Sequence, residues 1–137
     1  MIIKTVRNLL LEDSGVRAIF DERWYPLELP DAATFPAGVL TKASGLGEYV
    51  LAGDAGIERA RVQVDLYLEG YDALLEARLL VRRRLSGFRG GAASGNPCSI
   101  DSCKCIVDED LEVPETVRSG PRLRRRMLEF MIFNREV

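Results

Sequence analysis

The sequence predicts an α+β fold in which two helices pack on one face of a mostly antiparallel sheet of four or five strands. Three observations predict it. Apolar residues recur at helical spacing in two separate segments, one segment alternates strictly between apolar and polar residues, and a dense apolar segment lies near the end of the chain. The order helix, strands, helix, strands favours helices that cover one side of an antiparallel sheet.

The chain has 137 residues, of which 47% are hydrophobic and 29% are charged, and its net charge is −2. This length and composition are typical of one globular domain spanning residues 1–137. The apolar stretch at residues 2–11 is interrupted by Lys4, Arg7 and Asn8, so we expect neither a signal peptide nor a membrane span. We therefore expect an intracellular protein with no membrane partner.

The first half of the chain predicts a helix and two strands. Apolar residues at helical spacing predict a helix over residues 2–12, which residues 13–15 should end. Aromatic and aliphatic residues predict strands over residues 23–29 and 38–43, with prolines marking their connection.

Residues 44–57 contain four glycines and predict a long, mobile excursion between strands. Alternation then predicts a strand over residues 60–68 with one buried face and one largely polar face. After Gly70 the apolar period changes to that of a helix, with Leu74 and Val81 on its buried stripe, and Gly87 is placed to end it.

The last third predicts a loop and two further strands. Glycines predict a surface loop over residues 88–97, and extended structure should resume at Cys98 with a bulge near Ser102. Residues 127–133 are dense in Met, Leu, Phe and Ile, which predicts a strand that is central in the sheet or lies at an interface.

No catalytic, metal or cofactor site can be assembled from these residues. The chain has no histidine, which removes the usual general base and neutral metal ligand. The glycines between residues 90 and 95 have phosphate-loop spacing, but Asn96 and Pro97 stand where that loop needs Lys and Ser or Thr. Cys98, Cys103 and Cys105 are read as free thiols, the last two facing the core. We therefore expect a protein that is not an enzyme and has no cofactor.

The acidic run at residues 108–112 permits a calcium or magnesium site, but a cross-strand interpretation accounts for more of the chain. If residues 114–120 form a hairpin turn, acidic residues of one strand face arginines of the next. The predicted pairs are Asp108 with Arg126, Asp110 with Arg124, and Glu112 with Arg122. Such pairs would set the register of the two strands.

Arg82, Arg83 and Arg84 close the second predicted helix, where cations complement the negative end of the helix dipole. No carboxylate lies three or four residues earlier on the helix to pair with any of them. Their partners could be solvent, the acidic run of a neighbouring subunit, or DNA passing through a channel. All three interpretations remain open from the sequence.

Four segments together resemble the phage tail-completion family, formerly a domain of unknown function. They are "RWYPLELP" at residues 23–30, "FPAGVLTKASG" at 35–45, "ERARVQVDLYLEGYDALLEARLLVRRRLSGFRG" at 58–90, and "DEDLEVPET" at 108–116. The most specific part is the strand from Arg61 to Asp65 together with the helix that follows it and its "LSGFRG" exit.

The resemblance implies a fold similar to the tail terminators of long-tailed phages. It implies a homo-oligomer, a hexameric ring, that caps the head-proximal end of the tail tube and joins the tail to the head connector or stopper protein. DNA would pass through the ring lumen without sequence recognition. The protein would be made in the host bacterial cytoplasm and lie in the virion tail, at the head–tail interface of a phage, a prophage or a gene transfer agent.

Three alternatives remain: a head-side adaptor or stopper of the head–tail connector, an intracellular enzyme that works without histidine, and a small DNA-binding regulator. For the tail terminator, we expect subunit or tube contacts at Tyr49 and Leu51 in the glycine-rich excursion. The arginine cluster and the charged hairpin supply the other candidates, which are Arg82, Arg83, Arg84, Asp108, Asp110, Arg124 and Arg126. We expect the excursion to become ordered only on contact with a neighbouring subunit or tube ring.

Overall fold

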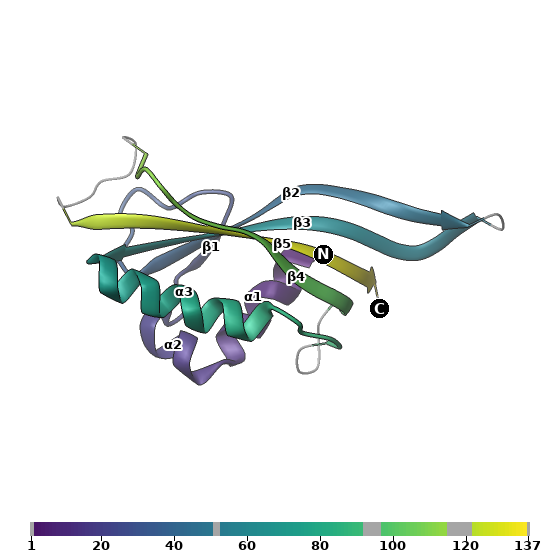
Figure 1. Cartoon of the computed structure of the whole chain (residues 1–137), viewed down its shortest axis with the longest axis horizontal. Coiled ribbons are helices and arrows are strands. Elements are labelled where there is room, and N and C mark those ends of the chain that lie inside the picture. Colours follow the sequence, from purple (N-terminus) through teal and green to yellow (C-terminus); the bar gives the residue numbers. More distant parts are fainter. Residues whose placement is uncertain (1, 51–52, 92–96, 115–121, 137) are drawn as a thin grey trace.

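The computed structural model describes residues 2–50, 53–91, 97–114 and 122–136, without the side chains of residues 46–50, 53–55 and 136. Within these ranges, helices lie on one side of a five-stranded sheet (Figure 1). The helices are α1 (Ile2–Glu12), α2 (Ser14–Phe20) and α3 (Tyr71–Leu85). The strands are β1 (Trp24–Pro26), β2 (Ala37–Val50), β3 (Gly53–Glu69), β4 (Cys98–Leu111) and β5 (Leu123–Glu136). The predicted α+β class is confirmed.

The sheet has the strand order β1-β2-β3-β5-β4. Every neighbouring pair is antiparallel except β1 and β2, which run parallel. β5 lies between β3 and β4, so the prediction of a central strand over residues 127–133 is confirmed. β1 has only three residues, because the chain leaves the sheet after Pro26, and the predicted strand over residues 23–29 is correspondingly too long.

The first helix ends at Glu12, as predicted, but residues 13–15 do more than stop it. Asp13 is the N-cap of α2, and its Oδ1 accepts a hydrogen bond of 3.0 Å from the Val16 amide. Such caps satisfy an amide that has no partner within the helix. The sequence did not predict α2, because residues 13–15 both end α1 and begin α2 and were interpreted only as the end of a helix.

The third helix agrees closely with the prediction. Leu74, Ala77, Val81 and Leu85 form its buried stripe, and the helix ends at Leu85. Gly87 follows with a positive φ of 79°, a conformation that glycine adopts at little cost.

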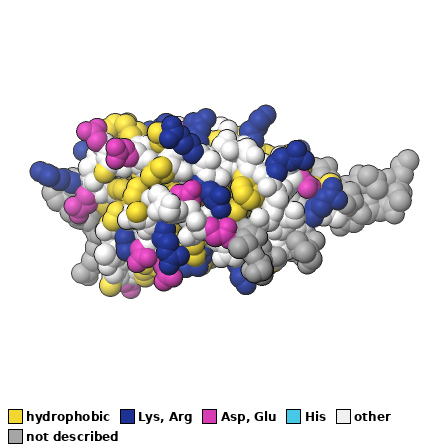
Figure 2. Space-filling model, turned by 90° about the horizontal axis from the view of Figure 1, so that it is seen from below, with side chains coloured by type: hydrophobic (Ala, Val, Ile, Leu, Met, Phe, Trp, Pro, Cys, Tyr) yellow, Lys and Arg dark blue, Asp and Glu magenta, His cyan; other side chains and the backbone are white. Residues whose placement is uncertain are grey.

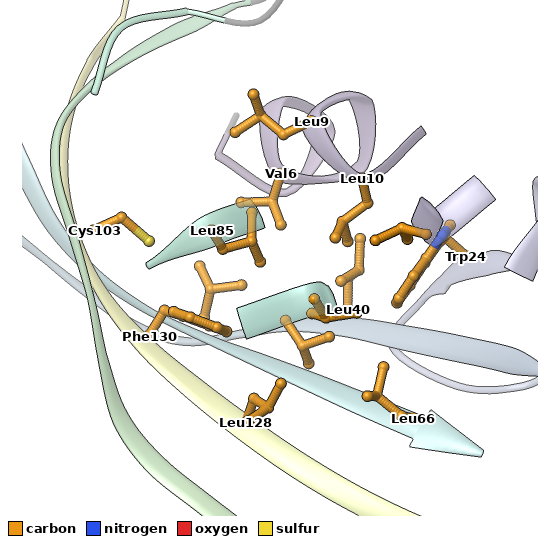
Figure 3. Close-up of a cluster of buried hydrophobic side chains, with 14 of the residues drawn as sticks. Val6, Leu9, Leu10, Trp24, Leu40, Leu66, Leu85, Cys103, Leu128 and Phe130 are labelled. Atoms are coloured by element: carbon orange, nitrogen blue, oxygen red, sulfur yellow. The ribbon is translucent and has the colours of Figure 1, made fainter. Parts of the chain in front are cut away.

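The main core lies between the helices and the sheet. Alternate residues of β3, including Val62, Val64 and Leu66, are fully buried against the helices, and Leu128 and Phe130 of β5 lie beside them (Figure 3). Each fully buried aliphatic or aromatic side chain contributes about 1.5–3 kcal/mol relative to an exposed one. The prediction that one face of residues 60–68 is buried is therefore confirmed.

The prediction that residues 44–57 form a long, mobile excursion between strands is wrong in its placement, because the described residues of this segment belong to β2 and β3 themselves. β2 and β3 remain paired from Ser44 opposite Arg61 to Val50 opposite Gly53. The described residues of 44–57 are here called the arm, and past Glu58, where the pairing of β3 with β5 ends, the two strands extend beyond the rest of the sheet (Figure 1). The glycine count misled the prediction because pairing between two neighbouring segments overrides the weak strand propensity of glycine.

β4 contains two irregularities in its pairing with β5. One lies between Ile100 and Ser102, which confirms the predicted bulge, and a second lies between Cys105 and Val107. Each bulge adds one residue to β4 and shifts the register that follows.

We predict that Gly38→Ala destabilises the protein by about 1–3 kcal/mol, because its added Cβ would overlap the ring of Trp24. Trp24 is itself held against Phe20, with ring centroids 4.6 Å apart, so it has little room to move. Urea unfolding measures the change. Gly91→Ala is the matched control, because a Cβ there meets only a backbone oxygen at 3.9 Å. Equal stabilities of the two variants would contradict the prediction.

Candidate assembly surfaces

Asp108 is the centre of a charged cluster that joins α3 to the sheet. Its Oδ2 lies 2.9 Å from Arg78 Nη1 and 2.8 Å from Arg82 Nη1, and its Oδ1 lies 2.7 Å from Arg126 Nε. The Asp108 side chain is only 12% exposed, so solvent screens these pairs less than it screens surface pairs. One carboxylate thereby fastens a helix and two strands together.

Arg126 extends the cluster to Asp110, whose Oδ1 lies 2.7 Å from Arg126 Nη1. The Tyr71 hydroxyl donates a 2.9 Å hydrogen bond to the other oxygen of Asp110. The hydrogen bond from Arg126 is the largest cause that holds the pKa of Asp110 below its ordinary value of 3.8, and the bond from Tyr71 acts in the same direction.

The predicted register of the charged hairpin is wrong by two residues. Asp110 lies opposite Arg126, not Arg124, and Asp108 reaches Arg126 diagonally. The ladder ends where Leu111 pairs with Arg125, so Glu112 does not face Arg122. The two bulges explain the shift: the predicted register holds at Ser99 opposite Arg135, and each bulge then moves it by one residue. Residues 115–120 of the predicted turn lie outside the described residues.

Two of the three arginines that close α3, Arg82 and Arg84, have partners within the same chain, which the sequence did not identify. Arg82 pairs with Asp108. Arg84 donates from Nε to the Leu9 carbonyl at 2.8 Å and lies 3.3 Å from Glu12. Arg83 is exposed, and no ion pair joins it to another described residue. Arg82 stays 44% exposed beside this ion pair, so Arg82 and Arg83 both present exposed side chains on α3.

Basic and acidic side chains are interspersed over the described part of the helix-covered face (Figure 2). A protein that binds duplex DNA through bulk charge gathers Lys and Arg on one surface. The distribution on this face does not favour the DNA-binding alternative.

The opposite face of the sheet, here called the open face, carries two nearly buried carboxylates. Asp65 is 3% exposed and lies 2.8 Å from Arg125, and Glu129 is 5% exposed and lies 2.9 Å from Arg61. Gln63 donates a further hydrogen bond to Asp65 at 2.9 Å. A nearly buried charge is tolerated only when it is paired in this way.

The sequence reading did not single out these four charged residues, although a signal was present. Glu129 interrupts the densest apolar segment of the chain, and Asp65 lies on the polar side of the alternating strand. The pairing of β3 with β5 puts Gln63 opposite Glu129 and Tyr67 opposite Arg125. Arg61 and Asp65 each lie two residues away along β3, so Arg61 reaches Glu129 and Asp65 reaches Arg125 diagonally. Between the ion pairs and beyond them, Met127, Met131 and Phe133 are half-buried on the same face.

One end of the open face is covered by the segment that follows β1. A pocket of about 300 Å³ lies there, between residues 27–33 and the sheet, and Asp65 and Arg125 form part of its wall. Because both groups are already bonded to each other, the pocket presents no free charge from this pair to a ligand.

The predicted contacts in the arm are only partly described. Tyr49 lies in β2 opposite Asp54, and its side chain is not described. Leu51 lies outside the described residues. The backbone pairing of Tyr49 with Asp54 nonetheless places Tyr49 in the arm.

The described residues contain no group of three or more His, Cys, Asp or Glu that could hold a metal ion. Cys98 and Cys103 are buried and Cys105 is half-buried, and all three are free thiols. Burial, with a contribution from Cys105, raises the pKa of Cys103 to about 12. Because the thiolate is the reactive form, Cys103 behaves as a core side chain and not as a nucleophile. No helix in the described ranges is long and apolar enough to span a membrane.

We predict that Asp108→Asn destabilises the protein by about 1–3 kcal/mol, because three guanidinium groups lose their shared charge partner. Urea unfolding at neutral pH measures the effect. Glu109→Gln, a change of the same size at the exposed neighbouring residue, should alter stability by no more than about 0.5 kcal/mol. Similar losses in the two variants would show that Asp108 is not the anchor.

The lowered pKa of Asp110 predicts a loss of stability in acid. Its ionised form is favoured by folding, so its contribution is complete above pH 3.8 and is lost as the pH falls through the lowered pKa. Unfolding midpoints measured across this range should therefore separate wild type from Asp110→Asn near neutral pH and converge in acid. In Tyr71→Phe, which lacks one hydrogen bond that lowers the pKa of Asp110, the loss should be smaller and should be complete at a higher pH. Parallel curves for all three proteins would refute this.

Comparisons with known proteins identify a fold relative. No protein-family model matches the chain, and no curated protein sequence matches it. Among solved structures, a chain of one titled "Virion of native gene transfer agent (GTA) particle" superposes with a TM-score of 0.75 at 14% sequence identity. The similarity covers 99% of this chain and 95% of that chain. The protein thus shares its whole α+β fold with a component of that particle.

Proposed function

We propose that this chain is a structural virion protein of a phage or phage-derived particle, and that it is the tail terminator. Its subunits form a ring, a hexamer, that closes the head-proximal end of the tail tube and joins it to the head connector. The observation that carries the proposal is the end-to-end fold similarity to a chain in a gene transfer agent virion.

The motifs of the tail-completion resemblance support the same role. The longest of them, residues 58–90, coincides with most of β3, the whole of α3 and the turn after it. This part of the chain builds both the centre of the sheet and its main covering helix. A resemblance that follows a complete structural unit supports common ancestry more strongly than a short motif on a loop.

The part of the chain that the structure describes contains surface that is available for contact with other subunits. The ion pairs around Asp108 and on the open face are satisfied within one subunit. The arm, by contrast, is a two-stranded ribbon that extends past the body of the protein (Figure 1). An isolated two-stranded ribbon is at best marginally stable in water, so a contact along its length would stabilise it.

We predict that shortening the arm by deleting residues 47–53 leaves folding intact and abolishes tail capping. The pairing of β2 with β3 remains up to Leu46 opposite Arg59, which keeps the part of β2 that lies beside the rest of the sheet. Purified variant and wild type would be mixed with tail tubes, and ring-capped tube ends would be counted by negative-stain electron microscopy. Glu76→Ala, which changes an exposed α3 residue that is not among the candidate contacts, serves as a matched surface control.

Several outcomes would count against the proposal. A wild-type protein that stays monomeric and never associates with tubes would overturn the tail-terminator role. Binding to the isolated head connector, but not to tubes, would instead identify a head-side adaptor or stopper. Normal capping by the shortened variant would remove the arm from the mechanism and leave the role itself standing.

A further inference from the structure

Two stretches of strand edge lack a strand partner among the described residues. On one side of the sheet, β1 pairs with β2 only from Gly38 to Leu40, so the outer edge of β2 is free beyond that point. On the other side, the outer edge of β4 bonds to backbone only at its beginning, and in its second half the Asp108 carbonyl accepts a 3.4 Å hydrogen bond from the Arg126 side chain. Gly90 exchanges two 2.8 Å hydrogen bonds with Ile100, and the Gly87 amide donates to the Cys103 carbonyl at 2.8 Å.

These bonds show which backbone groups of β4 point outward. The groups of Ile100 and the carbonyl of Cys103 face away from β5, and the bulge between them accounts for their odd spacing. Continuing this alternation through the second bulge turns the backbone groups of Asp110 outward as well. The second half of β4 therefore presents amides and carbonyls in the pattern that accepts another strand.

Each free edge contains a regular stretch of similar length. In β2 the register is uninterrupted from Ser44 to Glu48, between two irregularities, and in β4 it is uninterrupted from Val107 to Leu111. Both stretches have five residues, which is close to the mean length of a strand in globular proteins. One stretch can pair with the other over its whole length.

We propose that β2 in the arm of one subunit pairs edge to edge with the second half of β4 in a second copy of this chain. The two edges lie on opposite sides of the sheet, so the contact is head to tail and joins the sheets of successive subunits. A head-to-tail contact closes into a ring when the rotation per subunit allows it. The inference rests on the proposed ring and names the surface that builds it.

The features that flank the two stretches limit where pairing occurs. Bulges and charged side chains on an edge strand disfavour indiscriminate pairing. β4 carries bulges on either side of the exposed Lys104, and the exposed Glu109 lies within the accepting stretch. Ile106, at the second bulge, is a large apolar side chain that remains 42% exposed in the single chain. A neighbouring strand would cover it.

The side chains of Ser44 and Glu109 lie on the same face of the sheet. Ser44 pairs with Arg61 and Glu109 pairs with Met127, and both of these partners belong to the open face. Directly paired residues project to the same side of a sheet. In a sheet that continues from one copy to the next, cysteines at these two positions would lie on one surface and near one another.

The experiment is cross-linking of the full-length double variant Ser44→Cys, Glu109→Cys with a short bis-maleimide reagent, followed by denaturing gel electrophoresis. The head-to-tail contact predicts a ladder of dimers, trimers and higher species. Each single variant alone should give no ladder, and an equal mixture of the two should stop at the dimer. Wild type treated in parallel accounts for the native thiols, of which Cys105 is half-buried and the other two are buried.

A matched control keeps Ser44→Cys and moves the second cysteine to Glu76, an exposed position on α3 that is not among the candidate contacts. This variant should yield no ladder. Absence of a ladder from the Ser44, Glu109 pair would overturn the proposal, as would dimers formed by Glu109→Cys alone, which indicate a two-fold contact between β4 strands. The assay contains no tail tubes, so it tests the subunit contact independently of the tail-terminator role. A ladder from a protein that does not cap tubes would support the contact and count against the role.

Discussion

The architecture depends on the strict alternation of β3. This strand pairs with β2 on one side and β5 on the other, so its two faces define the two faces of the sheet. Val62, Val64 and Leu66 take the helix-covered face and are fully buried. A slip of one residue would place Arg61, Gln63 and Asp65 beneath the helices, which would leave their charges and amide without solvent. The hydrophobic effect and the cost of charge burial therefore select the same register.

The open face follows from the same alternation. Asp65 and Glu129 are nearly buried there, and each is held by an arginine of the neighbouring strand. Loss of either arginine would leave a carboxylate unpaired, so these ion pairs favour the register of β3 and β5 more than they add to stability. Since the charges are internally satisfied, a partner that covers this face would meet half-buried methionines and a phenylalanine between paired groups.

In the folded structure the acidic run at residues 108–112 has a different role from the predicted one, because α3 packs beside it. From the sequence, Asp108 and Asp110 were assigned to arginines across a hairpin. Asp108 in fact gathers two arginines from α3 and one from β5. Helical spacing placed Arg78 and Arg82 on one side of α3, but which strand that side would meet depends on contacts between segments far apart in the chain. Arg82 and Arg83 both remain exposed, whereas Arg84 is half-buried.

The sequence by itself determined the α+β class, the first and last helices, the central strand and the absence of a histidine-based catalytic site, because each follows from local periodicity or composition. It also located one bulge in β4. Tertiary structure decided the second bulge, the true register of β4 with β5, the strand pairing in the arm and the partners of Arg82 and Arg84. These features depend on which backbone groups and charges meet across long separations in the chain. Local patterns do not determine which distant segments come together. The same reason explains why the two free strand edges became visible only in the folded sheet.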